Sequence, residues 1–118
     1  MRLLALLLLA AALATACGTA RRIVPPTEVL AARDPELAHG QVLFMQACNQ
    51  CHPRGEAGVG PAINNKPLPA FLIRYQIRHG LGAMPAFPPA AFSEEEVTAI
   101  VRYLQFLHTE APIPPTAS

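Results

Sequence analysis

An apolar run at the N-terminus limits how much of this chain can form a folded domain. Residues 3–14 follow Met1 and Arg2 and consist only of Leu and Ala. The run is shorter than the roughly 20 residues of a membrane-spanning helix, so residues 1–16 are predicted to be an export signal. About 100 residues remain, which suffices for one small domain and excludes a doubly wound enzyme or a TIM barrel.

The composition predicts that this domain needs a stabiliser beyond its own core. The chain has no Trp, five Phe and two Tyr, and a domain of this size buries only about 60–65% of its unfolded surface. Small domains commonly add a disulfide, a metal or another covalent restraint. The three cysteines, Cys17, Cys48 and Cys51, are the candidates.

The charge balance argues against a nucleic-acid partner. Without Arg2 the chain carries eight basic and eight acidic residues, whereas nucleic-acid-binding domains are usually strongly basic. The charges are unevenly distributed, because residues 52–84 carry a net +3 and residues 85–118 a net −3. The molecule is therefore predicted to be an electric dipole.

The residues around Cys17 predict how the chain is exported. Leu13-Ala14-Thr15-Ala16-Cys17 resembles a bacterial lipoprotein signal, which is cut before the cysteine, although Ala14 replaces the usual Leu. The resemblance implies a lipid anchor on Cys17, and several acyl chains hold a protein stably at a membrane. An ordinary secretory signal, cut near Ala16 or Gly18, is the alternative. Both interpretations place the domain in the periplasm or on the outer face of the cytoplasmic membrane.

Proline-rich segments delimit the predicted folded unit. Pro25-Pro26 lies in residues 17–32, which are predicted to be an extended tether because adjacent prolines favour polyproline geometry. Residues 110–118 form a second proline-rich segment, the tail. The domain is therefore expected within residues 33–109.

Three helices are predicted within these bounds. Asp34-Pro35-Glu36 is typical of a helix start, and this helix should run to about Ala47. Residues 67–79 form the second, ended by Gly80, and the capping box Ser93-Glu94-Glu95-Glu96 begins the third.

The predicted helices have apolar faces at helical spacing, and no alternating strand pattern is found, so the fold class is all-α. The faces consist of Leu37, Gly40, Phe44 and Ala47 in the first helix, Leu68, Leu72 and Tyr75 in the second, and Val97, Ile100, Val101, Leu104 and Leu107 in the third. The long Gly- and Pro-rich connections 53–66 and 81–92 are expected to enclose something.

The pentapeptide Cys48-Asn49-Gln50-Cys51-His52 carries the chemistry. Two cysteines two residues apart and a following histidine are the attachment signature of c-type haem. Cys48 and Cys51 would form thioethers with the two vinyl groups, and the imidazole of His52 would bind iron. A thioredoxin-like dithiol would need a βαβ context, and a zinc site would need a fourth ligand such as His39 or His79.

Further motifs extend the resemblance to a family. Residues 40–44 upstream of the pentapeptide, Gly60-Pro61 downstream of it, residues 80–85 and Tyr103 together resemble a class I cytochrome c of the small bacterial single-haem kind, over residues 36–107. The resemblance implies three main helices packed around one covalently bound haem c. It also implies that the first and last helices cross near Gly40, Phe44 and Tyr103.

Met84 is predicted to be the second axial ligand of the iron. It lies 32 residues after His52 on a flexible loop, whereas Met45 lies only three residues before Cys48, on the helix that leads into the motif. His79 is the alternative ligand. The resemblance implies that the Pro61 carbonyl accepts a hydrogen bond from the other nitrogen of His52. Two candidate donors to the Met84 sulfur are Asn64 and Tyr75.

These residues predict an electron carrier rather than an enzyme, with redox proteins as partners. The alternatives are a haem subunit of an oxidoreductase complex, a ligand-binding haem sensor in which Met84 is labile, and a metal-handling protein. The basic segment is predicted to dock an acidic partner through Arg54, Lys66, Arg74 and Arg78.

Overall fold

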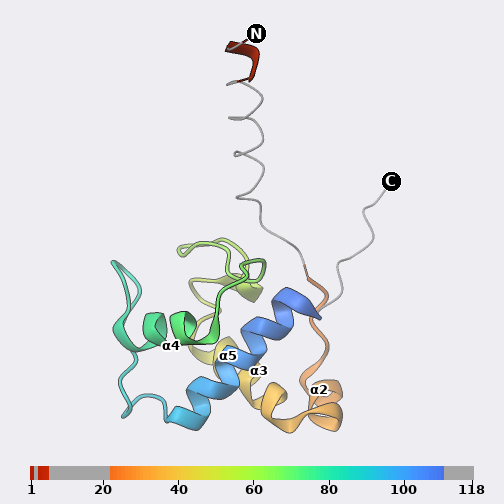
Figure 1. The fold of residues 1–118 in the computed structure, drawn as a ribbon. Helices are drawn as coiled ribbons and strands as arrows, with labels where there is room; N and C mark the ends of the chain where they lie inside the picture. The colour runs from red at the N-terminus through yellow and green to blue at the C-terminus, as the bar shows by residue number, and fades with distance from the viewer. Residues whose placement is uncertain (2, 6–21, 111–118) are drawn as a thin grey trace.

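The computed structural model describes residues 1, 3–5 and 22–110, and from residue 22 onward the chain is helical (Figure 1). The helices are α2 (Thr27–Arg33), α3 (Pro35–Ala47), α4 (Ala70–His79) and α5 (Glu94–Thr109), with a short 3-10 helix η1 at Pro53–Gly55. No strand occurs in the described residues, where Leu81 and Met84 form an isolated bridge. The prediction of an all-α domain is confirmed.

Cys17, most of the predicted export signal and residues 111–118 of the predicted tail lie outside the described residues. Among the helices that are described, none has the length and apolar character needed to cross a membrane.

The start of each long helix is fixed by local side-chain contacts. Asp34 accepts a hydrogen bond from the Leu37 amide at 3.0 Å at the start of α3. At the start of α5, Ser93 accepts from the Glu96 amide at 3.2 Å and its own amide donates to the Glu96 carboxylate at 2.8 Å. These contacts satisfy amides that lack a partner in the first turn of a helix, and they confirm both predicted starts.

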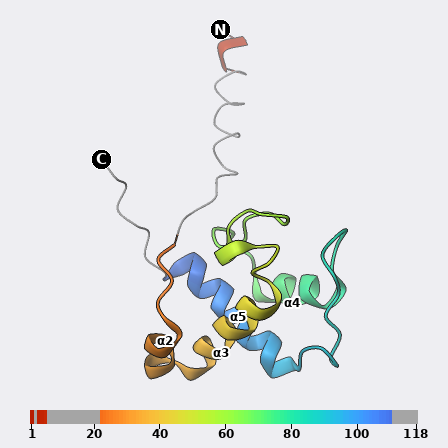
Figure 2. The same cartoon turned by 180° about the vertical axis from the view of Figure 1, so that it is seen from behind.

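Helices α3 and α5 cross in direct backbone contact (Figures 1 and 2). A Cβ atom on Gly40 would lie 2.0 Å from the carbonyl oxygen of Ala99, so only glycine permits this approach. Beside it, the rings of Phe44 and Tyr103 are fully buried with centroids 5.4 Å apart. The expected crossing at Gly40, Phe44 and Tyr103 is therefore confirmed.

The core divides into two clusters on either side of this crossing. One joins α2, α3 and the second half of α5, and contains Leu30, Ala38, Phe44, Tyr103, Phe106 and Leu107. The other joins α3, α4 and the first half of α5, and contains Leu43, Ile73, Ile77, Val97, Ala99, Ile100 and Val101. Helices α3 and α5 contribute to both clusters, whereas α2 and α4 contribute to one each.

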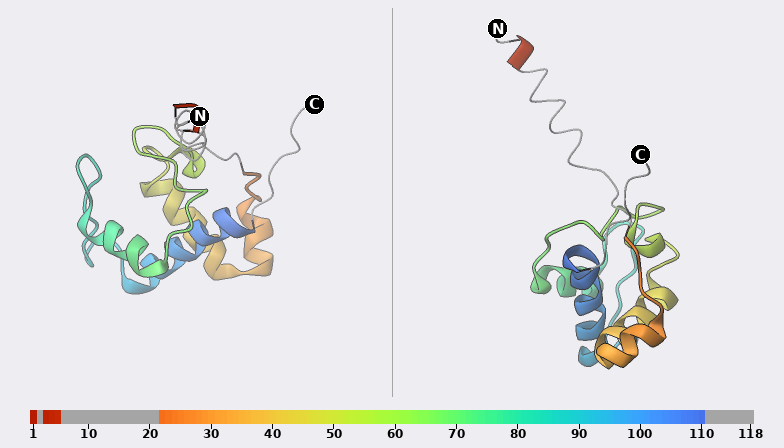
Figure 3. Two further views of the ribbon diagram at one scale, coloured as in Figure 1. Left: turned by 45° about the horizontal axis from the view of Figure 1, so that its top comes forward. Right: turned by 90° about the vertical axis from the view of Figure 1, so that its right-hand side faces the viewer.

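The prediction of an extended tether up to residue 32 was wrong, because residues 27–33 form α2 beside α3 (Figure 3). Leu30 is only 1% exposed. The side-chain amide of buried Gln41 donates through Nε2 to the Pro25 carbonyl at 3.0 Å, and its Oε1 atom accepts from the Thr27 hydroxyl at 2.7 Å. The two prolines direct the chain into α2, and the folded unit extends back to residue 22.

The predicted start of the second helix was wrong, and its predicted apolar face is not covered by the protein core. Helix α4 begins at Ala70 and buries Ile73 and Ile77, whereas Leu68, Leu72 and Tyr75 are 37%, 40% and 59% exposed. The prolines at positions 67 and 69 delay the helix start, since Pro69 has an extended backbone (ψ 148°). The protein core therefore covers the isoleucine face of α4 and not the leucine–tyrosine face.

The crossing predicts a large effect of one added methyl group. Gly40→Ala should lower the free energy of unfolding by about 2–3 kcal/mol, since overpacking at the Ala99 carbonyl outweighs the better helix propensity of alanine. Denaturant unfolding of the haem-loaded protein measures this change. His39→Ala, at the exposed neighbouring position, should change the free energy by less than about 0.5 kcal/mol. Equal effects of the two substitutions would contradict the close crossing.

Candidate haem site

The cysteine–histidine motif continues directly from the end of α3. The His52 and Cys51 amides both donate to the Cys48 carbonyl, at 2.9 and 3.2 Å. This turn keeps the two thiols one helical turn apart, and both are free and partly buried. The core packing of α3 therefore determines where the motif begins.

His52 is buried and its ring is fixed by the loop that follows. Its Nδ1 atom lies 2.8 Å from the Pro61 carbonyl oxygen. A carbonyl oxygen only accepts, so Nδ1 carries the proton and Nε2 keeps a free lone pair for a metal. A Cβ on Gly60 would lie 2.2 Å from Cε1 of the ring. The Gly60-Pro61 step thus makes the contact that the resemblance implied.

The loop reaches His52 through a tight reversal within η1. Arg54 and Gly55 have positive φ angles of 56° and 77°, and the Arg54 amide donates to the Asn49 side chain at 2.8 Å. The Gly60 amide then donates to the Cys51 carbonyl at 2.9 Å. These contacts fold the loop back over the end of the motif.

Met84 lies on a short hairpin turn after α4. The amide and carbonyl of Leu81 pair with those of Met84 at 3.1 and 3.0 Å, and Gly82 between them has a φ of 58°. Gly80, with a φ of 66°, could not carry a Cβ, which would lie 2.4 Å from the Met84 carbonyl oxygen. The two glycines therefore set the path of this loop.

The donor to the Met84 sulfur is Gln76, whose side-chain amide lies 3.5 Å from Sδ. Asn64 and Tyr75 were the donors predicted from the sequence, and Gln76 was not among them. The Tyr75 ring instead stacks on His79, with centroids 4.0 Å apart. Gln76 could have been found from its position one turn before Gly80, on the helix that leads into the Met84 loop.

His79 contacts its own helix. Its Nδ1 lies 2.8 Å from the Tyr75 carbonyl oxygen, and the residue is exposed at the end of α4. Among the described residues, no three His, Cys, Asp or Glu side chains are arranged to hold a metal ion. The zinc site that the sequence left as an alternative gains no support from this part of the chain.

Comparison with known proteins identifies the family. Residues 35–104 match the family model described as cytochrome c oxidase, cbb3-type, subunit III. This chain belongs to the class I c-type cytochromes. The cytochrome is 36% identical over 81 residues to the 4-cresol dehydrogenase [hydroxylating] cytochrome c subunit of Pseudomonas putida, covering 69% of this chain and 71% of that protein. It is 32% identical over 111 residues to the chloroplastic cytochrome c6 of Chlamydomonas reinhardtii, covering 86% and 74%.

The cofactor of this cytochrome is a covalently bound haem c, and the residues present fit it. The two thiols are unpaired, and His52 offers a free Nε2 atom. Large apolar side chains remain exposed on the segments that carry or adjoin these groups, namely Val59, Leu68, Leu72, Tyr75 and Leu81. An apolar porphyrin ring needs such a lining, and a fold complete without a cofactor would bury more of these side chains.

The thiols do not fit the redox-dithiol alternative. Burial, with a smaller contribution from the neighbouring Cys51, raises the pKa of Cys48 to about 11. A catalytic dithiol needs a pKa lowered below the ordinary value, because the thiolate is the nucleophile. Cys48 is therefore protonated at neutral pH and lacks the lowered pKa of a redox dithiol.

Proposed function

We propose that this cytochrome carries single electrons with His52 and Met84 as the two axial ligands of its haem iron. The observation that carries the proposal is the contact between His52 Nδ1 and the Pro61 carbonyl, which leaves Nε2 as the ligand atom. The haem supplies a one-electron couple between ferric and ferrous iron. Cys48 and Cys51 hold it through thioethers.

The polar contacts of the two ligands would tune the same couple. Donation from His52 to Pro61 makes the imidazole more basic and fixes its orientation. The Met84 thioether is a weak donor that raises the potential, and its contact with Gln76 withdraws further electron density from the sulfur. With both axial positions filled, the iron has no open site for a substrate, which supports a carrier rather than an enzyme.

A second candidate function is that of a haem subunit in a dehydrogenase complex. It is favoured by the likeness to the cytochrome c subunit of 4-cresol dehydrogenase, a protein that is part of an oxidising enzyme. In either role the partners are redox proteins. Copurification of a dehydrogenase in a fixed ratio with the cytochrome would favour the subunit over the free carrier.

The hypothesis of a basic docking face is weakened by the pairing of its arginines. Arg78 contacts Glu94 at 2.5 Å and Arg74 contacts the same carboxylate at 3.8 Å. Of the four basic residues named from the sequence, these two share one acidic partner. Arg54 and Lys66 alone would have to steer an acidic partner, so electrostatic steering should contribute little to association.

We also propose that the cytochrome is exported and anchored through lipidated Cys17. The support is the signal-like sequence before Cys17. Only residues 18–21 separate that cysteine from Arg22, whose guanidinium donates to the His108 carbonyl at 3.0 Å. A linker this short spans at most about 18 Å, so an anchored domain would stay close to the membrane surface.

Replacing the proposed sulfur ligand should open the iron to external ligands. Met84→Ala should abolish the far-red sulfur-to-iron absorption band of the oxidised protein, and its reduced form should bind carbon monoxide rapidly. Met45→Ala is the matched control, because Met45 is exposed on α3 and should keep the band. Retention of the band in Met84→Ala would contradict the proposed ligation, and rapid carbon monoxide binding by the unaltered protein would favour a sensor.

Removing the Gln76 donor should lower the reduction potential. Without its hydrogen bond the sulfur donates more strongly and stabilises the ferric form. A hydrogen bond worth about 0.5–1 kcal/mol corresponds to a shift of roughly 20–40 mV for a one-electron couple. Redox titration of Gln76→Leu measures the shift, with the exposed Gln105→Leu on α5 as control. An unchanged or higher potential in Gln76→Leu would refute this role.

The anchor can be tested in a bacterial host that matures both lipoproteins and haem. Cys17→Ser should move the cytochrome from the membrane fraction to the soluble periplasmic fraction, because removing the thiol removes the site of lipid attachment. The haem spectrum should not change, which serves as the control for folding. A protein that remains soluble with Cys17 intact would exclude the anchor.

A further inference from the structure

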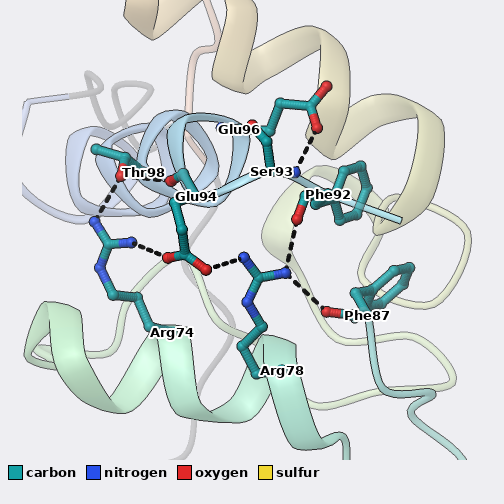
Figure 4. Close-up of polar contacts among 8 residues, drawn as sticks. All are labelled: Arg74, Arg78, Phe87, Phe92, Ser93, Glu94, Glu96 and Thr98. Carbon is teal, nitrogen blue, oxygen red and sulfur yellow. Dashed lines mark hydrogen bonds and ion pairs between the residues drawn. The ribbon is translucent and has the colours of Figure 1, made fainter. Parts of the chain in front are cut away.

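Arg78 has three acceptors around its guanidinium and little contact with solvent (Figure 4). Its Nη1 atom donates to the carbonyl oxygens of Phe87 at 3.0 Å and of Phe92 at 2.8 Å. Its Nη2 atom pairs with Glu94 at 2.5 Å, and the side chain is 16% exposed. Arg78 thus joins the last turn of α4 to the following loop and to the first turn of α5.

Both carbonyls belong to the loop that carries Met84. Phe87 follows Met84 by three residues, and its amide donates to the Ile77 carbonyl at 2.9 Å. Phe92 stands directly before the cap residue Ser93. Arg78 therefore holds the loop at two points, one just after Met84 and one where the loop joins α5.

The loop has few other polar ties to the helices. The pairing of Leu81 with Met84 lies within the loop itself, and the rings of Phe87 and Phe92 pack on each other at 5.2 Å. Hydrogen bonds from a charged donor are stronger than those between neutral groups. Loss of the guanidinium would leave two carbonyls without this donor, and the hydrogen bond from the Phe87 amide to the Ile77 carbonyl would then have to hold this part of the loop to α4 without its support.

Arg74 provides a natural comparison one turn earlier on α4. It contacts the same carboxylate, Glu94, at 3.8 Å and donates to the Thr98 hydroxyl at 2.7 Å. These contacts join α4 to α5, as the contact between Arg78 and Glu94 also does. Thr98 and Glu94 both lie on α5 and not on the Met84 loop, so a comparison of the two arginines separates helix packing from loop positioning (Figure 4).

We propose that Arg78 is a positioning residue for the axial ligand, which clamps the Met84 loop and limits how readily Met84 leaves the iron. The proposal rests on the proposed ligation by Met84. It deepens that function by assigning the control of ligand exchange to a side chain that does not touch the haem iron. Weakening the clamp should raise the fraction of molecules in which external ligands can replace the sulfur.

The test is an imidazole titration of the oxidised, haem-loaded protein, in which binding is monitored by the loss of the far-red sulfur-to-iron band. Arg78→Gln should bind imidazole about tenfold more tightly than the unaltered protein, because loop release no longer breaks hydrogen bonds to a charged group. Arg74→Gln should stay within about twofold, since it loses only surface contacts between helices. Hydrogen exchange at the Phe87 amide should quicken in Arg78→Gln alone.

Each outcome decides the proposal. Equal imidazole affinities for Arg78→Gln and the unaltered protein would overturn it, and so would equal increases in both arginine variants. If Arg78→Gln does not fold, Arg78→Lys replaces it in the titration. Lysine keeps the charge near Glu94 but cannot reproduce the planar fork of hydrogen-bond donors. An unaltered imidazole affinity in that variant would overturn the proposal. An unaltered protein without the far-red band would instead refute ligation by Met84 itself.

Discussion

The backbone contact between α3 and α5 at Gly40 is the constraint on which the haem site depends. Helix α3 ends at Ala47, directly before Cys48, and α5 begins directly after the loop that carries Met84. Gly40 lies directly against the Ala99 carbonyl, so α3 and α5 form one rigid pair. The segment that carries His52 and the loop that carries Met84 are both attached to this pair. Loops without regular structure can then hold the ligands, because their ends are fixed by close packing.

Each proposed ligand is oriented by a polar contact from the surrounding chain. The Pro61 carbonyl accepts a hydrogen bond from His52. Gln76 donates to the Met84 sulfur, and Arg78 donates to the Phe87 carbonyl in the same loop as Met84. A single contact of this kind contributes little to stability. Its larger effect is on the ligand. The Pro61 carbonyl determines which nitrogen of His52 carries the proton, and Gln76 lowers the electron density on the Met84 sulfur.

The sequence predicted features that depend on local chemistry or on a short motif. The helix starts at Asp34 and Ser93 follow from capping residues a few positions apart, and the haem motif is one continuous pentapeptide. Helix α2 was missed because its seven residues are stabilised by Gln41 and the core. The exposed face of α4 was misassigned because the pattern shows which residues are apolar but not whether protein or haem covers them. Gln76 was missed because its contact with the Met84 sulfur forms only where the loop folds back onto α4, and the sequence does not show the path of that loop.

Proton NMR of the reduced cytochrome, labelled with carbon-13 in the methionine methyl groups, tests the central claim most directly. A methyl group bound over the haem plane experiences the ring current and moves far upfield. With His52 and Met84 as ligands, the Met84 methyl should be shifted in this way, and the methyl of the exposed Met45 should resonate near its usual position. A spectrum in which no methionine methyl is shifted upfield, or in which the shifted signal belongs to Met45, would contradict the account.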